Sequence, residues 1–320
     1  MTNEQILNKR WQEIDKYLLK YLKSYRKINR ETKDRIQEIF DNIDFSYKDI
    51  NKLIPKAKKN RLKKYIKELQ KKGLLTNYFG YKARLVLSKK NITYAEWLEI
   101  MIQSAYMEEN KELEEYNNTL YYSVCENSYN QGLEEIPQEE YRSYKSFNFP
   151  IYYAILNIPI LTITAGEYIR IIELENAQEL YKKTLANIQL GKELNVDSNF
   201  YQELFKKQNN RVISINDDKL SGGIVNVVEN LSNSAYLQAG IENEVQRCRL
   251  IAEMDNRTTK MCDTLNNQIF NLKGMNVYQR YSDIDKRIVT YHTMGLVRGE
   301  NLPPIDNHFH WCRSTITYQI

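Results

Sequence analysis

The sequence predicts a mainly α-helical protein with long N-terminal and central helices and a small α+β module at the C-terminus. Three observations lead to this fold class. Apolar residues recur every three to five positions over long stretches of the first 245 residues, close to the spacing of one helix face. The 320 residues include only six prolines and eleven glycines, which disfavours a β-sandwich or a disordered linker protein. After Val245 the periodicity gives way to short mixed segments.

Two helical regions are predicted at the N-terminus. The first covers residues 3 to 42, and the second lies between Pro55 and Gly73, residue types that favour the start and the end of a helix. In the second region one apolar stripe runs at positions i, i+3, i+4 and i+7, and lysines cover the other faces. The stripe is Leu62, Tyr65, Ile66 and Leu69.

The central part is predicted to be helical on both sides of an irregular segment. Thr93 and Glu96 form a capping-box pattern that opens a helix reaching about Asn130. Residues 136–165 lose periodicity and include three prolines, so we place a subdomain junction there. Ser221-Gly222-Gly223 indicates a turn or hinge. Further helices are predicted at 167–190, 199–207 and 223–245.

The C-terminal part is predicted to mix strands and a helix. Segments 249–254, 268–272 and 315–320 have the character of strands, and Ser282 to Thr293 that of a helix. The sequence thus suggests three domains: a basic helical region (1–135), a central helical region (136–244) and the α+β module (245–320).

Charge is distributed unevenly along the chain. Residues 1–90 contain 25 Lys or Arg and 10 Asp or Glu, whereas the remaining 230 residues contain 21 and 31. The first part is therefore basic and the remainder acidic, although the net charge is only +5. Such a split suggests two different partners, one of them polyanionic.

The basic residues of the second helical region are the candidate DNA-binding residues. One interpretation is a solvated surface helix of a lysine-rich protein. The other is a helix that contacts DNA phosphates without reading bases, since no base-reading motif or recognition helix is present. The candidates are Lys56, Lys58, Lys59, Arg61, Lys63, Lys64, Lys67, Lys71 and Lys72.

No catalytic motif of the phosphate-loop, nucleophile-elbow or zinc-protease type occurs, so no catalytic residue and no cofactor are expected. Cys262, His308, His310 and Cys312 would make a chemically suitable zinc set. The alternating spacing of the last three is poor for one ion, because they would lie about 7 Å apart along a strand. The alternatives are buried free cysteines with hydrogen-bonded histidines, or a Cys/His nucleophilic pair without an identifiable orienting group.

Compartment and membrane expectations follow from composition. Four cysteines without a secretory signal indicate a reducing compartment. The most apolar run, residues 149–165, is interrupted by Asn157 and Pro159 and is too short to span a bilayer. We therefore expect synthesis in a cytoplasm and no membrane association.

The last seventy residues carry an ordered set of motifs: Asp-x-Arg-Thr-x-x-x-Cys, Leu-x-x-x-Ile-Phe, Asn-Leu-Pro-Pro and His-x-Cys-Arg-Ser-Thr. In this order they resemble the C-terminal domain of the minor head, or head-morphogenesis, proteins of tailed phages (the Mu F-like family). Many relatives have Cys-x-x-Cys and Cys-Arg-Cys where this chain has Thr259-Lys-Met-Cys262 and Cys312-Arg-Ser314. The matching positions are Asp255, Arg257, Thr258, Cys262, Leu265, Phe270, Pro303, Pro304, His310, Cys312, Arg313 and Ser314.

The resemblance implies a structural, non-enzymatic component of the virion, made in a bacterial host cytoplasm and located in the capsid interior or at the portal vertex. It implies association with the phage portal protein and with capsid or scaffolding proteins, and a part in procapsid assembly and genome packaging or delivery. The basic N-terminal region fits contact with double-stranded DNA without sequence preference. The alternative is a metal-dependent DNA-processing enzyme that uses the C-terminal His/Cys cluster; Asp306 is the only acid within five residues of that segment.

Overall fold

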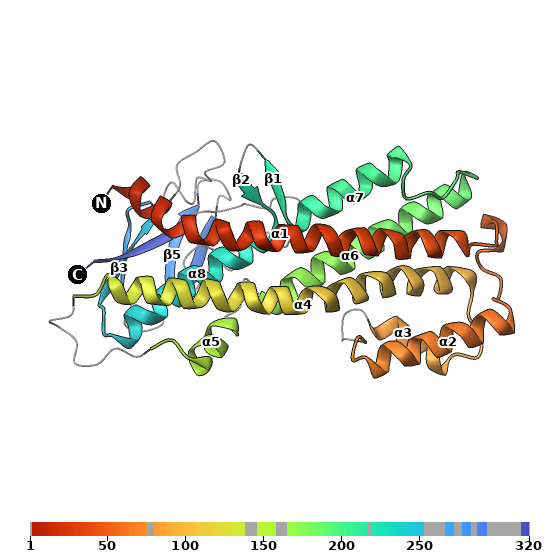
Figure 1. The fold of residues 1–320 in the computed structure, drawn as a ribbon, viewed down its shortest axis with the longest axis horizontal. Helices are drawn as coiled ribbons and strands as arrows, with labels where there is room; N and C mark the ends of the chain where they lie inside the picture. Colours follow the sequence, from red (N-terminus) through yellow and green to blue (C-terminus); the bar gives the residue numbers. More distant parts are fainter. Residues whose placement is uncertain are drawn as a thin grey trace. The chain divides into compact units, whose positions relative to one another are not determined.

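The computed structural model describes residues 2–75, 80–137, 146–157, 165–216, 219–252, 266–271, 277–282, 287–292 and 315–319. In these residues the chain is mainly helical with a small C-terminal strand element, as predicted (Figure 1). The helices are α1 (Asn3–Asp41), α2 (Lys56–Lys71), α3 (Gly80–Ser88), α4 (Tyr94–Glu134), α5 (Phe149–Leu156), α6 (Ala165–Gln189), α7 (Asn199–Val212) and α8 (Gly223–Glu242). The strands are β1 (Ser214–Asn216), β2 (Lys219–Ser221), β3 (Arg247–Ile251), β4 (Ile269–Asn271), β5 (Val277–Ser282), β6 (Arg287–His292) and β7 (Thr315–Gln319).

The chain divides into two compact units, each built from separated segments. Unit 1 comprises Met1–Leu22, Asn117–Ile169 and Arg211–Ile320, and unit 2 comprises Lys23–Tyr116 and Arg170–Asn210. The helices α1 and α4 therefore contribute residues to both units. The three predicted domains, with boundaries near residues 135 and 244, are continuous segments of the sequence, whereas each of these units combines separated segments that contact one another. The three-domain division therefore stays a prediction.

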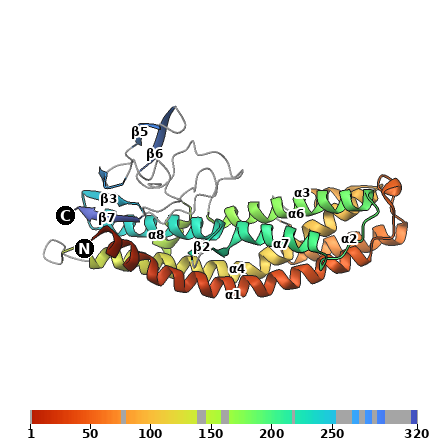
Figure 2. The same cartoon turned by 90° about the horizontal axis from the view of Figure 1, so that it is seen from above.

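Unit 2 is a helical bundle made by parts of α1, α4, α6 and α7, which run alongside one another (Figures 1 and 2). Periodic apolar positions on each helix face a common core, which hydrophobic burial stabilises. The predicted helix at residues 3–42 is confirmed as α1, which is one unbroken helix. Core residues with no exposed surface include Ile36, Ile66, Leu69, Leu98 and Leu180.

The short helices α2 and α3 belong to the same core. Of the predicted apolar stripe, Leu62, Ile66 and Leu69 are at most 2% exposed, and Tyr65 is partly buried against the same core. The capping box at the start of α4 is confirmed as well: the Glu96 N–H donates to Thr93 Oγ1 (3.3 Å) and the Thr93 N–H donates to Glu96 Oε2 (3.0 Å). The helix α3 was not predicted.

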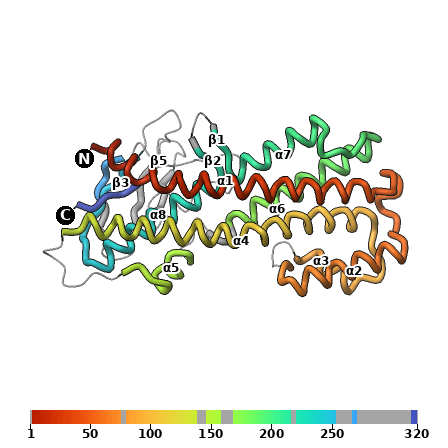
Figure 3. The backbone as a smooth tube through the Cα atoms, viewed as in Figure 1, coloured from red at the N-terminus to blue at the C-terminus, as the bar shows by residue number. Residues whose placement is uncertain are grey.

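The helix α6 ends where the sequence indicated. Gly191 has a φ of 62°, in the left-handed region that glycine tolerates best. The Lys192 N–H then donates to the Asn187 carbonyl (2.9 Å), which satisfies a terminal carbonyl of the helix. Residues 190–198 lead from there into α7 (Figure 3).

Unit 1 is organised around α8, most of whose residues are buried. The predicted turn at Ser221-Gly222-Gly223 precedes it, and Gly222 has a φ of 116°. A Cβ atom at Gly222 would lie 2.6 Å from the Val212 carbonyl oxygen, so only glycine fits this position. Ser232 of α8 and Ser128 of α4 share a hydrogen bond of 2.8 Å between their hydroxyls.

Three small antiparallel sheets complete the described part of unit 1. The strand β3 lies between β4 and β7, β5 pairs with β6, and β1 pairs with β2. In the three-stranded sheet Cys248 lies opposite Phe270 on one side and Tyr318 on the other. The predicted strands near 249, 268 and 315 are confirmed, with β3 beginning two residues earlier than expected.

Two predictions about local structure are wrong. A helix was predicted over Ser282 to Thr293, but in the described part of that range Ser282 ends β5 and Arg287–His292 form β6. The two strands pair from Ser282–Arg287 to Val277–His292. The run Ile-Val-Thr-Tyr in β6 consists of β-branched and aromatic residues, which favour a strand. The irregular segment 136–165 includes a helix, α5, whose Asn148 side chain accepts from the Ile151 N–H (3.1 Å) at its start.

Candidate nucleic-acid interface

The helix α2 presents its predicted DNA-binding residues in two different environments. Because Leu62, Ile66 and Leu69 are buried against unit 2, the opposite face of α2 is turned to solvent. Among the nine candidate basic residues, three are only partly exposed and six are exposed. The exposed ones are Lys56, Arg61, Lys64, Lys67, Lys71 and Lys72.

The three partly exposed lysines bind groups of unit 2 itself. Nζ of Lys63 donates to the carbonyls of Leu87 (2.9 Å) and Lys89 (2.8 Å), so it caps the C-terminal end of α3. Nζ of Lys59 lies 3.3 Å from the Lys90 carbonyl. Nζ of Lys58 binds Asp44 and is described below. These contacts give the three residues a structural role, and a direct part in DNA binding stays a prediction for them.

None of the six exposed basic residues forms an ion pair with a described residue. Lys64, Lys67 and Lys71 follow one another at intervals of three and four, so their ammonium groups are neighbours on one helix face. Like charges at this spacing destabilise an isolated helix by a few tenths of a kcal/mol per pair. The arrangement therefore creates a strongly positive face at a small cost to local stability.

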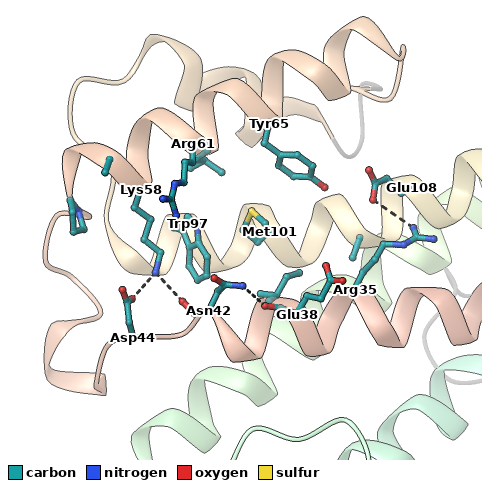
Figure 4. Close-up of a pocket in the computed structure, with 15 residues that line it drawn as sticks. Arg35, Glu38, Asn42, Asp44, Lys58, Arg61, Tyr65, Trp97, Met101 and Glu108 are labelled. Atoms are coloured by element: carbon teal, nitrogen blue, oxygen red, sulfur yellow. Dashed lines mark hydrogen bonds and ion pairs between the residues drawn. The ribbon is translucent and has the colours of Figure 1, made fainter.

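A groove of about 570 Å³ lies beside α2, between it, α1 and α4 (Figure 4). Its apolar lining includes the buried side chains of Ile39, Leu62, Trp97 and Ala105. Such a volume suits a small ligand or a few side chains of a partner. Its polar lining includes Arg35, Glu38, Asp44, Lys58 and Glu108.

One end of the groove is occupied by Lys58. Its Nζ lies 4.1 Å from the centroid of the Trp97 ring and donates to Asp44 Oδ1 (2.6 Å) and to the Asn42 carbonyl (3.0 Å) (Figure 4). A cation over an indole ring and beside a carboxylate is stabilised by both. Tyr94 and Phe45 also face this ammonium group, at 5.3 and 5.8 Å.

The other end is held by Arg35. Its Nη2 donates to both carboxylate oxygens of Glu112 (2.8 and 2.9 Å), and its Nη1 lies 3.7 Å from Glu108 Oε2. Tyr65 extends from α2 toward this end (Figure 4). Burial, followed by the charge of Glu108, raises the pKa of Tyr65, so the phenol stays protonated and can donate a hydrogen bond.

A second basic stripe was missed by the sequence analysis. It lies on the part of α1 that belongs to unit 2, at positions i, i+3, i+4 and i+7, opposite the buried Tyr25 and Ile28. Only one of its members has an ion pair with a described residue, a loose one of 3.9 Å between Lys27 and Glu31. The signal was available, because residues 17–30 contain no acid. The stripe is Lys23, Arg26, Lys27 and Arg30.

The residues that carry the phage resemblance lie outside the described residues, as do the four candidate zinc ligands. Only Phe270 is described, in the backbone of β4. Among the described residues no group of three or more His, Cys, Asp or Glu side chains is arranged to hold a metal ion. The described cysteines, Cys125 and Cys248, are free and buried, and burial raises the pKa of Cys248 to about 12. Burial raises the pKa of Cys125 as well, which disfavours the thiolate form of both side chains at neutral pH.

No helix within the described ranges combines the length and apolar character needed to cross a bilayer. Comparison with protein-family models, with curated proteins and with solved structures found no match to this chain.

Proposed function

We propose that this chain is a non-enzymatic minor head protein of a tailed phage that contacts duplex DNA, without sequence preference, through the exposed face of α2. The observation that carries the DNA contact is the set of six exposed basic side chains, five on α2 and Lys72 at its C-cap, none in an ion pair with a described acid. The phage assignment is supported by the ordered C-terminal motifs, from Asp255 to Ser314.

The physical basis of the DNA contact is electrostatic. Lysines on a regular helix face can neutralise successive phosphates and release condensed counterions, which favours binding to any duplex. The net charge of -10 over residues 91–320 suits contact with protein partners such as the portal, capsid or scaffolding proteins.

A salt series of duplex binding tests the DNA contact. We expect the full chain to bind unrelated duplexes about equally, with an affinity that falls steeply as salt rises. Replacing the four lysines of the solvent face by glutamine should flatten the log–log salt slope by about 3 to 4, because each lost contact removes about 0.9. These four are Lys56, Lys64, Lys67 and Lys71.

A matched control removes the same charge elsewhere in unit 2. The variant Lys182→Gln, Lys183→Gln, Lys192→Gln, Lys206→Gln changes four exposed lysines on α6, on α7 and between them. It should bind nearly as tightly as the natural chain. An equal loss in both variants would show a general charge effect, and a strong preference for one duplex sequence would also contradict the proposal.

The virion assignment has a separate test. An antibody against the chain should detect it in purified particles, at few copies per particle, and its absence from particles would contradict the assignment. The alternative, a metal-dependent DNA-processing enzyme, requires a bound metal at Cys262, His308, His310 and Cys312. We expect elemental analysis to find no stoichiometric zinc and chelator to leave the melting temperature unchanged.

A further inference from the structure

A layer of polar side chains crosses the helical bundle of unit 2. The Tyr106 hydroxyl donates to Gln208 Oε1 (2.7 Å), and Gln208 Nε2 donates to the Asn176 carbonyl (2.9 Å). Asn209 Nδ2 donates to Asn29 Oδ1 (3.0 Å). These bonds join α1, α4, α6 and α7. Buried polar groups of this kind are tolerated because they are hydrogen-bonded to one another.

Two carboxyl groups lie in this layer. Glu109 of α4 and Glu173 of α6 are both 0% exposed. Asn29 Nδ2 donates to Glu109 Oε1 and Asn176 Nδ2 donates to Glu173 Oε2, each over a long distance of 3.4 Å. Hydrogen bonding with Thr32 also lowers the pKa of Glu109, and hydrogen bonding with Tyr25 lowers that of Glu173. The other oxygens, Glu109 Oε2 and Glu173 Oε1, are buried without a hydrogen-bond partner. In the described chain no Lys or Arg nitrogen lies within 4 Å of either group.

The charged and titratable groups around the pair compensate little of its charge. The positive charge of Arg35 on α1 lowers the pKa of Glu109, but its guanidinium group is bound to Glu112 and lies near Glu108. The phenol of Tyr25 on α1 lies beside Glu173. The two α7 side chains in this layer, Gln208 and Asn209, are uncharged. An isolated buried carboxylate is costly, and two like charges in one buried site are costlier still.

We infer that Glu109 and Glu173 form a proton-holding pair that keeps the bundle of unit 2 closed while it is protonated and loosens it when both carboxyls ionise. Protonation places a hydroxyl donor on carboxyl groups that each have one oxygen, Glu109 Oε2 or Glu173 Oε1, without a hydrogen-bond partner. Glutamine has the same shape as a protonated glutamate and always carries donors, so it should reproduce the closed state at every pH.

The direction of the pH dependence follows from the environment. Burial raises the pKa of Glu109 to about 7, and burial together with the charge of Glu109 raises the pKa of Glu173 well above its ordinary range. Between the unfolded pKa near 4.5 and the folded pKa, the unfolded state has already released its proton while the folded state retains it. The contribution of the pair to stability is therefore greatest at low pH and falls as pH rises from about 4.5 through 7.

Glutamine variants test the pair. At pH 8 we expect Glu173→Gln and Glu109→Gln each to raise the melting temperature of unit 2 by roughly 5 °C or more. At pH 5 the same variants should melt close to the natural chain. Hydrogen exchange of peptides from the unit 2 parts of α4 and α6 shows whether the change in stability lies in unit 2. The control is Glu203→Gln, an exposed residue of α7, which should have no effect at either pH.

Infrared spectroscopy of the natural chain tests the proton without a mutation. At pH 7 a carbonyl band of a protonated carboxylic acid should be present, and it should diminish as the pH is raised further. Absence of this band, or glutamine variants that are equally destabilised at pH 5 and pH 8, would overturn the inference. A melting temperature at pH 8 raised by Mn²⁺ or Mg²⁺ in the natural chain alone would also overturn it, in favour of a metal site. None of these outcomes depends on whether the chain binds DNA.

Discussion

The guanidinium carbon of Arg10 lies 3.8 Å from the centroid of the Tyr236 ring. Tyr236 also stacks on Tyr318 at 4.4 Å between centroids, and its hydroxyl donates to Glu135. The Thr317 hydroxyl donates to the same carboxylate, at 3.2 Å. The cluster therefore joins α1, α8 and β7 of unit 1 with Glu135, the residue that follows α4, although Arg10 and Tyr318 come from opposite ends of the sequence.

Arg10 should be important for the stability of unit 1. It is 3% exposed, so replacing it by methionine keeps the apolar stem and removes the charge over the Tyr236 ring. We expect Arg10→Met to lower the free energy of unfolding by about 1–3 kcal/mol. The exposed neighbour provides the control: Lys9→Met should change it by less than about 0.5 kcal/mol. Equal stability of the two variants in urea denaturation would contradict this role.

Gly240 should be required for the packing of Tyr318. A Cβ atom at Gly240 would lie 2.5 Å from Cε1 of Tyr318, although Gly240 lies inside α8, where alanine favours helix formation by about 1 kcal/mol. We expect the clash to prevail, so that Gly240→Ala destabilises unit 1 by about 1–3 kcal/mol. In a Tyr318→Leu background the same change should cost much less, and a double-mutant cycle measures the difference. A stabilising Gly240→Ala would show that the ring moves aside freely.

Lys63 and Lys64 are adjacent in sequence but should behave in opposite ways. Lys63 caps two carbonyls at the end of α3, so Lys63→Met should lower stability by about 1 kcal/mol and weaken DNA binding less than Lys64→Met does. Lys64 is exposed, so Lys64→Met should leave stability unchanged within about 0.5 kcal/mol and weaken DNA binding. Thermal melts and duplex binding on the same two variants check both halves.

Lys58 should control the environment of Trp97. Removing its ammonium group by Lys58→Met takes a cation from the indole face and leaves Asp44 without its ion pair. We expect a changed Trp fluorescence spectrum and a loss of about 1–2 kcal/mol in the stability of unit 2. Asp44→Asn should give the smaller loss, because the cation–π contact remains. An unchanged spectrum in Lys58→Met would contradict the contact.

Local features were determined by the sequence alone. The stripe Leu62, Ile66 and Leu69 predicts the buried face of α2, and the Thr93–Glu96 capping box predicts the start of α4. The glycines at 191 and 222 predict where α6 ends and where α8 begins. Each of these depends on neighbours within a few residues in the chain, so periodicity and capping chemistry suffice to identify them.

Tertiary structure alone decided which charged and polar residues meet. Asp44 and Trp97 contact the ammonium group of Lys58, and the Arg10 guanidinium lies over the Tyr236 ring. Glu109 and Glu173 lie in the same buried polar layer. These partners are separated by 14 to 226 residues, and no local pattern fixes which helix faces will pack together. The helix predicted over β6 was wrong for the same reason. A short run of apolar residues is compatible with either a helix or a strand. Pairing with β5 supplies the backbone hydrogen bonds that favour the strand.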